Sequence, residues 1–367
     1  MTRCRIDFLV FVLLLAAAVP LAAEVRTWTL RSGTGATEAE FIDANNGDVW
    51  LKVPDAGVIH LPLDTLVDAD RQYVAKLLDD ERQQRAAAAP PDGPQTIHYG
   101  PGRLLANLQN AALTESSGVA PSHRVPGYFW SHNDSENEPR LFLFDRAGRD
   151  LGSCKLKGVE AYDWEDMASF IEDGKPRLLM ADTGNNGLNS AVQMIHILEE
   201  PPIDPQRGVL VDEVPVLRTL FVSFEDDFRN CEAVGIDPTD KTIVLISKER
   251  GPTCHAYVLR WPATDGPRAH TAKLVATLRL RQVTGLCISP DGRRAVVITY
   301  NNAFEFLRRE NEDWAAALGR GPREIAVPSR KQGESICFGL DGKTLYLTSE
   351  RRPTPLIEVP VTGIGNE

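Results

Sequence analysis

Short runs of alternating apolar and polar residues, separated by turn residues, recur at a fixed spacing over most of the chain. Five segments align without gaps over their first six residues, with starts 48, 67, 52 and 50 residues apart. They begin at Glu115, Asp163, Asn230, Gln282 and Gln332. A turn and further strand-like runs follow each start. Four antiparallel strands every 50 or so residues are typical of a β-propeller, so the repeat predicts one blade per segment.

The blade count depends on how the ring closes. Residues 115–361 contain five repeats, and the last has no fourth strand after it. Residues 95–113 precede the first repeat and could supply that strand, which gives five blades. Six blades remain open if residues 95–113 and a long insertion at 199–215 hide another blade.

The N-terminal region has a different pattern. Strand-like runs at residues 26–30, 37–43, 48–52 and 58–62 are separated by Gly- and Asn-rich turns, which tolerate positive φ. A helix is predicted over residues 64–85. The whole chain is therefore predicted to be all-β, with a small curled sheet followed by the propeller.

Particular residues in this region carry a family resemblance. Arg26-Thr27-Trp28, Val49-Trp50-Leu51-Lys52 and a closing block from Leu61 to Val74 follow one another at a characteristic spacing. The region resembles the first Sla homology domain, an SH3-like barrel that reads short peptide motifs. The resemblance implies a protein- or peptide-binding adaptor module, and a barrel that only tethers its neighbour is the alternative.

The ends of these patterns predict the domain boundaries. Residues 1–23 have two arginines, an 11-residue apolar core and a small-residue cleavage site, as in a secretory signal peptide. The barrel is predicted at residues 24–80, an Ala/Pro linker at 81–95 and the propeller at 96–367. We expect an exported protein, periplasmic or secreted, with no membrane span after signal cleavage.

The composition excludes some classes of partner and of active site. The net charge is −11 and no basic stripe is present, which argues against a nucleic-acid partner. Five cysteines remain after signal cleavage, without a C-x-x-C pair, and are predicted to be buried thiols. No nucleophile, zinc-protease or phosphate-loop motif occurs.

The repeat predicts what lines the channel. Positions 1 and 3 of every repeat are polar and position 5 is apolar. This pattern predicts a solvent-filled opening at one end of the channel, the mouth, above an apolar interior. The ends of the second strands predict a second ring around this mouth, and each member is capable of acid–base or ligand work. The ring consists of His132, Asp182, Lys248, Tyr300 and Glu350.

Carboxylates gather at these positions. They would repel one another and some of their pKa values would rise, unless a cation or a basic residue such as Lys248 lies among them. Carboxylate and Asn oxygens suit Ca²⁺ or another divalent cation, and charge spread out by water in a wide channel is the alternative. The predicted metal ligands are Asp163, Glu165, Asp182, Glu232 and Glu334. The repeat and its acidic channel loosely resemble exported propellers of the phytase-like, gluconolactonase-like and NHL groups, which implies fold and export but no activity.

Two functions stay open. The first is an exported interaction protein whose barrel binds a protein partner and whose propeller mouth binds a small ligand, with aromatic residues such as Tyr300 available there. The second is a metal-assisted hydrolase of an ester, lactone or phosphate, with His132 or Glu232 as general base. Lys248, Tyr300 and Glu350 are its other candidate catalytic residues.

Overall fold

A computed structural model describes residues 25–33, 35–45, 48–54, 57–88, 96–134, 138–262, 268–330 and 332–365. These residues form two compact units, divided between Tyr73 and Val74. Strands account for most of the regular secondary structure among the described residues, which confirms the all-β class. The predicted signal peptide at residues 1–23 lies outside the described residues, and so does most of the predicted linker. The predicted domain boundaries stay predictions.

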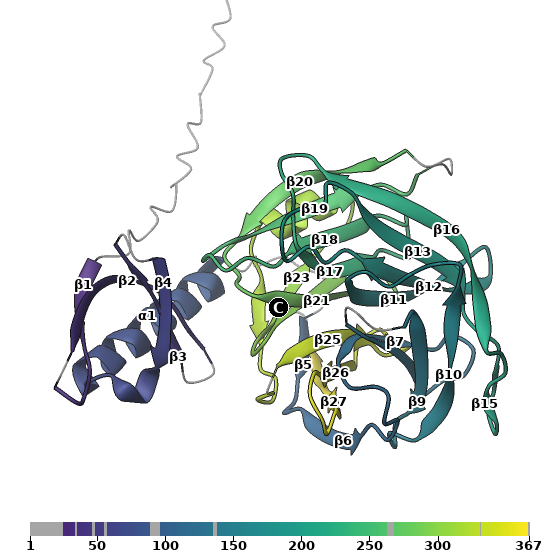
Figure 1. The fold of residues 1–367 in the computed structure, drawn as a ribbon, viewed down its shortest axis with the longest axis horizontal. Helices are drawn as coiled ribbons and strands as arrows, with labels where there is room; N and C mark the ends of the chain where they lie inside the picture. Colours follow the sequence, from purple (N-terminus) through teal and green to yellow (C-terminus); the bar gives the residue numbers. More distant parts are fainter. Residues whose placement is uncertain are drawn as a thin grey trace, which may run out of the picture. The chain divides into compact units, whose positions relative to one another are not determined.

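The first unit is an antiparallel meander of four strands, in the order β1-β2-β3-β4 (Figure 1). Its elements are β1 (Val25–Thr29), β2 (Ala36–Asn45), β3 (Asp48–Val53), β4 (Gly57–Pro62), the 3-10 turn η1 (Leu63–Thr65) and the start of α1 (Asp68–Ala88). The four predicted strands are confirmed. The predicted helix is shifted: it begins at Asp68, and the alanines after Arg85 continue it instead of forming a spacer, because alanine is the best helix former.

Asp70 joins the start of α1 to β1. Its buried carboxylate accepts hydrogen bonds from the backbone N–H of Thr29 at 2.8 Å and from the Arg26 guanidinium at 2.5 Å. The same guanidinium lies 4.0 Å from the ring centroid of Tyr73. Trp28 packs against Tyr73 and is almost completely buried. The closing block that carried the family resemblance is therefore the part that covers the core of this unit.

The second unit contains five four-stranded blades among the described residues. The inner strands are β7 (Ser116–Pro121), β11 (Trp164–Glu172), β17 (Cys231–Ile236), β21 (Val283–Ile288) and β25 (Gly333–Phe338). The second strands are β8 (Tyr128–Asn133), β12 (Lys175–Asp182), β18 (Ile243–Ser247), β22 (Arg294–Thr299) and β26 (Leu345–Ser349). The third strands are β9 (Arg140–Asp145), β13 (Gln193–Glu199), β19 (Cys254–Leu259), β23 (Ala303–Leu307) and β27 (Pro355–Val359). The outer strands are β10 (Asp150–Lys157), β16 (Glu213–Phe224), β20 (His270–Leu278), β24 (Arg323–Ile325) and β6 (Arg103–Asn107). Figure 1 shows the inner strands gathered in the middle of this unit.

The ring closes through the segment that precedes the first repeat. Strand β6 pairs antiparallel with β27, from Pro355 opposite Asn107 to Glu358 opposite Arg103. This pairing confirms that residues 95–113 supply the missing fourth strand. Strand β5 (Thr96–Tyr99) pairs separately with β28 (Val361–Gly365). Five blades result, because each of the five repeats is completed, and the strands left over in the described residues form only two-stranded pairs.

The insertion at 199–215 does not form another blade. It forms the short hairpin of β14 (Ile203–Asp204) and β15 (Gly208–Val209) and the start of β16. Strand β16 is long enough to pair in parallel with β10 at one end and with β20 at the other. Strand β16 therefore links the outer edges of three blades. The remaining helix, α2 (Trp314–Gly319), is capped by Asp313, which accepts a hydrogen bond from the N–H of Ala316.

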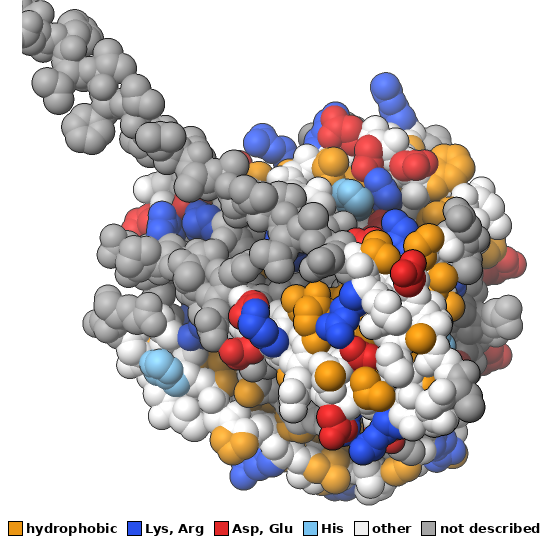
Figure 2. All heavy atoms as spheres, turned by 90° about the vertical axis from the view of Figure 1, so that its left-hand side faces the viewer, with side chains coloured by type: hydrophobic (Ala, Val, Ile, Leu, Met, Phe, Trp, Pro, Cys, Tyr) orange, Lys and Arg blue, Asp and Glu red, His pale blue; other side chains and the backbone are white. Residues whose placement is uncertain are grey.

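Apolar side chains fill the spaces between neighbouring blades. The five cysteines from Cys154 to Cys337 are free and buried, as predicted. No helix among the described residues is long and apolar enough to cross a membrane. On the face shown in Figure 2, basic and acidic side chains are mixed, and the described part of that face has no continuous basic stripe.

Candidate functional site

Every inner strand has a β-bulge at the same place. The pairing between the first and second strands shifts by one residue in all five blades, for example between Ser116 and Gly118 in β7. The residue at position 3 of each repeat is the extra one. A bulge re-aims the side chain of its extra residue and interrupts the ladder. The five bulge residues are Ser117, Glu165, Glu232, Thr284 and Glu334, and all are buried.

A lysine lies among the bulge glutamates. The Lys248 ammonium forms an ion pair with the Glu232 carboxylate and lies 4.9 Å from the ring centroid of Tyr300. Asn230 Nδ2 also donates to Glu232 Oε1, at 3.0 Å. Burial would lower the pKa of Lys248, but Glu232 and Glu334 together hold it above its ordinary value. Lys248 is therefore charged and is the counter-charge of Glu232, as one of the two alternatives from the sequence had it.

One lysine does not balance the carboxylates around it. Burial raises the pKa of Glu334 well above its ordinary value, and Glu232 and Glu350 raise it further although Lys248 opposes them. Burial also raises the pKa of Glu350, to about 7, with the charge of Asp134 adding to the effect. The mouth thus carries an excess of negative charge, part of which is relieved by protonation near neutral pH.

Three carboxylates at this end of the channel converge on one point. One carboxylate oxygen from each of Asp134, Asp163 and Glu165 lies within 4.8 Å of the others. Asp134 follows β8 of the first blade, whereas Asp163 and Glu165 begin the second blade. Burial raises the pKa of Glu165 well above its ordinary value, and the charges of Glu232, Asp134 and Asp163 raise it further. We call Asp134, Asp163 and Glu165 the acidic triad.

Gly184 makes room for the triad. A Cβ atom at this position would lie 2.2 Å from Asp163 Cγ and 2.3 Å from a carboxylate oxygen of Glu165. Any side chain there would displace both carboxylates. The backbone at Gly184 therefore leaves the space in which these two carboxylates approach each other.

Asp166 closes the channel below the mouth. Its side chain is completely buried, and Oδ2 accepts hydrogen bonds from the backbone N–H groups of Val234 and Leu286, each at 3.0 Å. Oδ1 accepts from Met167 N at 2.8 Å. The inner edge of a propeller blade has no neighbouring strand, so its N–H groups need other partners. Asp166 supplies them for two further blades and joins three inner strands.

The predicted second ring combines residues from different registers. The residue opposite the first inner-strand position is Asn133, Asp182, Ser247, Thr299 and Ser349 in the five blades. Lys248, Tyr300 and Glu350 are each one residue further along and are equivalent to one another. His132 lies one residue before this position and Asp182 lies at it. The equivalent residues in the first two blades are Asp134 and Thr183, because β8 and β12 end at different points in the repeat than the sequence suggested.

The His132 side chain is not exposed at the mouth of the channel. Its ring is fully buried and packs edge-on against Trp164, while Nδ1 lies 2.9 Å from Asn133 O. Its Nε2 occupies the space that a Cβ at Gly118 would need. Burial lowers the pKa of His132 to about 4. A neutral, enclosed imidazole gives no support to the predicted role of His132 as a general base.

The predicted metal ligands divide into groups. Asp163 and Glu165 belong to the acidic triad, whereas Glu232 forms an ion pair with Lys248. The charges of both Glu232 and Lys248 affect the pKa of Glu334. Asp182 accepts hydrogen bonds from the backbone N–H groups of Asp163 and Tyr162. It therefore fixes the loop that carries Asp163 and does not join the triad.

The predicted ligand set leaves out Asp134 and Asp166, although both lie in segments rich in oxygen ligands, and the sequence assigns Gly184 only to a tight turn. Asp134 could have been found by counting back from Lys248, Tyr300 and Glu350 to the polar residue that follows each second strand. Asp166 stood out as an acidic residue at position 4, where the other repeats have Gly, Ala or Ser. No sequence signal marks Gly184, whose role depends on the approach of two side chains.

Comparisons with known proteins cover the two parts of the chain separately. Residues 16–81 match the family described as SLA1 homology domain 1. Among solved structures, the chain is similar to the PQQ-bound form of an aldose sugar dehydrogenase from Streptomyces coelicolor. The identity is 11% and the TM-score 0.45, over 74% of this chain and 99% of that one. A likeness at that level carries no inference about chemistry. No curated protein matches the sequence.

Proposed function

We propose that this chain is a two-part interaction protein whose propeller mouth binds a divalent cation and, beside it, a small ligand. The observation that carries the proposal is the acidic triad, where three carboxylates from two blades meet, two of them beside Gly184. Carboxylates this close repel one another unless they share protons or a cation. The Lys248 ammonium, whose charge lowers the pKa of Glu165, also forms an ion pair with Glu232.

The residues of the triad fit Ca²⁺. It takes six to eight oxygen ligands in a flexible geometry, and carboxylates are its commonest protein ligands. Asp134, Asp163 and Glu165 would supply three of them, and a ligand with hydroxyl or carboxylate oxygens could supply others. The neighbouring Lys248 and Tyr300 would then contact an anionic or aromatic part of that ligand.

Thermal melting of the full chain tests whether a cation binds at the acidic triad. After treatment with chelator, 5 mM CaCl₂ should raise the melting temperature by about 3 to 5 °C, since a cation that binds only the folded state stabilises it by mass action. Asp134→Asn should remove most of that rise. Asp212→Asn, an exposed change on the insertion, is the matched control and should keep it. A melting temperature that changes neither with chelator nor with Ca²⁺ would refute the proposal.

The barrel is the proposed protein-binding module, as its family match suggests. On the outer face of its sheet, Trp50 and His60 stack with ring centroids 4.7 Å apart, and Val58 is half exposed beside them. Such an aromatic platform suits a short extended peptide. Peptides selected from a displayed library on the full chain should lose binding in Trp50→Ala and keep it in Lys76→Ala, an exposed change on α1. Selection of no peptide above background would contradict this role.

We also propose that the protein works outside the cytoplasm, on the strength of the signal-like pattern at residues 1–23. Mass spectrometry of the protein expressed in a bacterium with an export pathway should show a mature N-terminus at Glu24. Retention of residues 1–23 in the purified protein would argue against export.

A further inference from the structure

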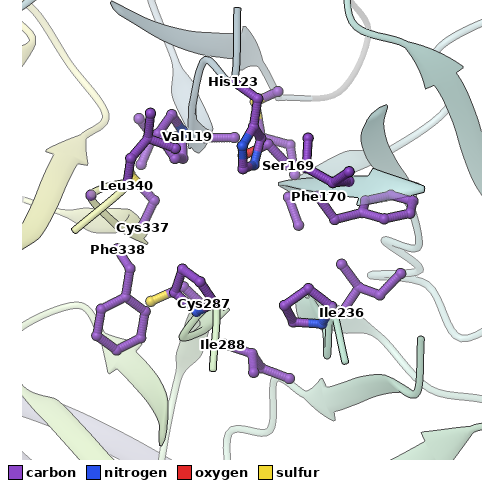
Figure 3. A pocket seen from close by; sticks show the side chains of 18 residues that line it. Val119, His123, Ser169, Phe170, Ile236, Cys287, Ile288, Cys337, Phe338 and Leu340 are labelled. Carbon is purple, nitrogen blue, oxygen red and sulfur yellow. The ribbon is translucent and has the colours of Figure 1, made fainter. Parts of the chain in front are cut away.

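The other end of the same channel contains a cavity. It measures about 290 Å³ and is lined by all five inner strands and the turns that follow them (Figure 3). Buried residues such as Met167, Cys287 and Cys337 line it, and its rim includes the exposed Ile171 and Leu340. Asp166 lies between this cavity and the acidic triad along β11, so the two ends are separate.

The repeat explains why there is a cavity at this end. Position 6 of each repeat carries a small residue: Ala120, Ala168, Gly235, Cys287 and Cys337. Small residues at the same level in five blades leave space in the middle of the ring. Position 7 supplies larger walls, and four of its five residues are apolar: Pro121, Ile236, Ile288 and Phe338.

Ser169 is the exception at position 7. Its hydroxyl oxygen is buried and has no hydrogen-bond partner among the described residues. The His123 ring hydrogen-bonds the backbone of the same residue, and burial lowers the pKa of His123, so its ring is neutral at neutral pH. Figure 3 shows both residues on one side of the cavity. A buried hydroxyl without a partner costs free energy unless a ligand satisfies it.

We infer that this cavity is a second binding site, for a small neutral molecule with an apolar body and one hydrogen-bonding group. The apolar walls would bury the body, and Ser169 would bind the polar group. A charged ligand is disfavoured because the cavity offers no opposite charge. This site is independent of the cation proposed at the acidic mouth.

Fluorescence of N-phenyl-1-naphthylamine with the full chain tests the inference, because this neutral probe brightens in apolar sites. We expect saturable enhancement, displaced by 1-octanol and by toluene but not by an equal concentration of octanoate. Ala168→Leu should fill the space at position 6 and weaken probe binding at least 10-fold. Ser169→Ala should weaken 1-octanol about 2- to 10-fold and leave toluene unchanged, since only the alcohol uses the hydroxyl.

Two further variants keep the test decisive. If Ala168→Leu does not fold, Leu340→Glu at the exposed rim should weaken probe binding instead, and Leu217→Glu, at an exposed leucine on β16, should not. No saturable enhancement with the unmodified chain would overturn the inference. Enhancement that both pocket variants leave unchanged would also overturn it, because the probe would then lie elsewhere.

Discussion

The two ends of the propeller channel are built from the same five strands and have opposite chemistry. At the start of the strands, position 3 carries Glu165, Glu232 and Glu334, and the acidic triad lies beside them. Three and four residues later, positions 6 and 7 carry mostly small and apolar residues around a cavity. One strand of about six residues thus serves a charged site at one end and an apolar site at the other.

The bulge and Asp166 make this contrast possible. The bulge at position 3 lets each blade direct a polar side chain out of the ladder without disturbing the apolar residues that follow. Directly below, Asp166 satisfies backbone N–H groups of two other blades. Asp166 thus connects the inner strands at a level between the two ends, and each end can have its own chemistry.

The largest expected effect on stability comes from removing the hydrogen bonds that Asp166 accepts from the inner strands. Asp166→Ala leaves three buried N–H groups without an acceptor and should lower the free energy of unfolding by about 3 to 5 kcal/mol. Asp166→Asn keeps an oxygen acceptor and should cost less. Urea unfolding measures both. A loss below about 1 kcal/mol for the alanine variant would mean that Asp166 does not hold the ends apart.

Removing the positive charge at the acidic end comes next. Lys248→Met leaves Glu232 and Glu334 buried together and should lower the free energy of unfolding by about 3 kcal/mol at pH 8. The loss should shrink toward pH 5, as the carboxylates take up protons. Lys155→Met, which removes an exposed ion pair with Glu138, is the control and should cost less than 1 kcal/mol. A loss as small as that of the control would show that the mouth does not depend on Lys248.

A smaller effect concerns pH. Glu350 has a pKa raised to about 7 in the folded protein, so the folded state holds its proton more tightly than the unfolded chain does. Stability from this group is therefore fully present below about pH 4.3 and falls as pH rises to about 7. Glu350→Gln should remove this dependence and stabilise the protein by about 1 kcal/mol at pH 8, after allowance for solvent screening. Equal stability of the two proteins from pH 4 to 8 would contradict the raised pKa.

The smallest expected effect is the absence of coupling between the ends. Saturating Ca²⁺ should leave the affinity for N-phenyl-1-naphthylamine unchanged within about 2-fold, because Asp166 and the rigid inner strands separate the sites. A larger change in affinity would show that the two ends communicate.

The repeat made much of the fold predictable. Five aligned segments located all the inner strands, since a strand buried on both sides in every blade leaves a regular signal. The polar mouth also followed from positions 1 and 3. The second ring did not, because one-residue differences in where β8 and β12 end change which residues are equivalent. The apolar cavity was not predicted, although its small residues at position 6 are visible in the sequence.

The central claim is that the acidic mouth holds a cation at Asp134, Asp163 and Glu165. Calorimetric titration of CaCl₂ into the chelator-treated full chain tests it most directly. We predict one site per chain, abolished in Asp163→Asn and unchanged in Asp212→Asn and in the cavity variant Ser169→Ala. No measurable heat of binding at millimolar Ca²⁺, or binding that survives Asp163→Asn, would contradict the claim.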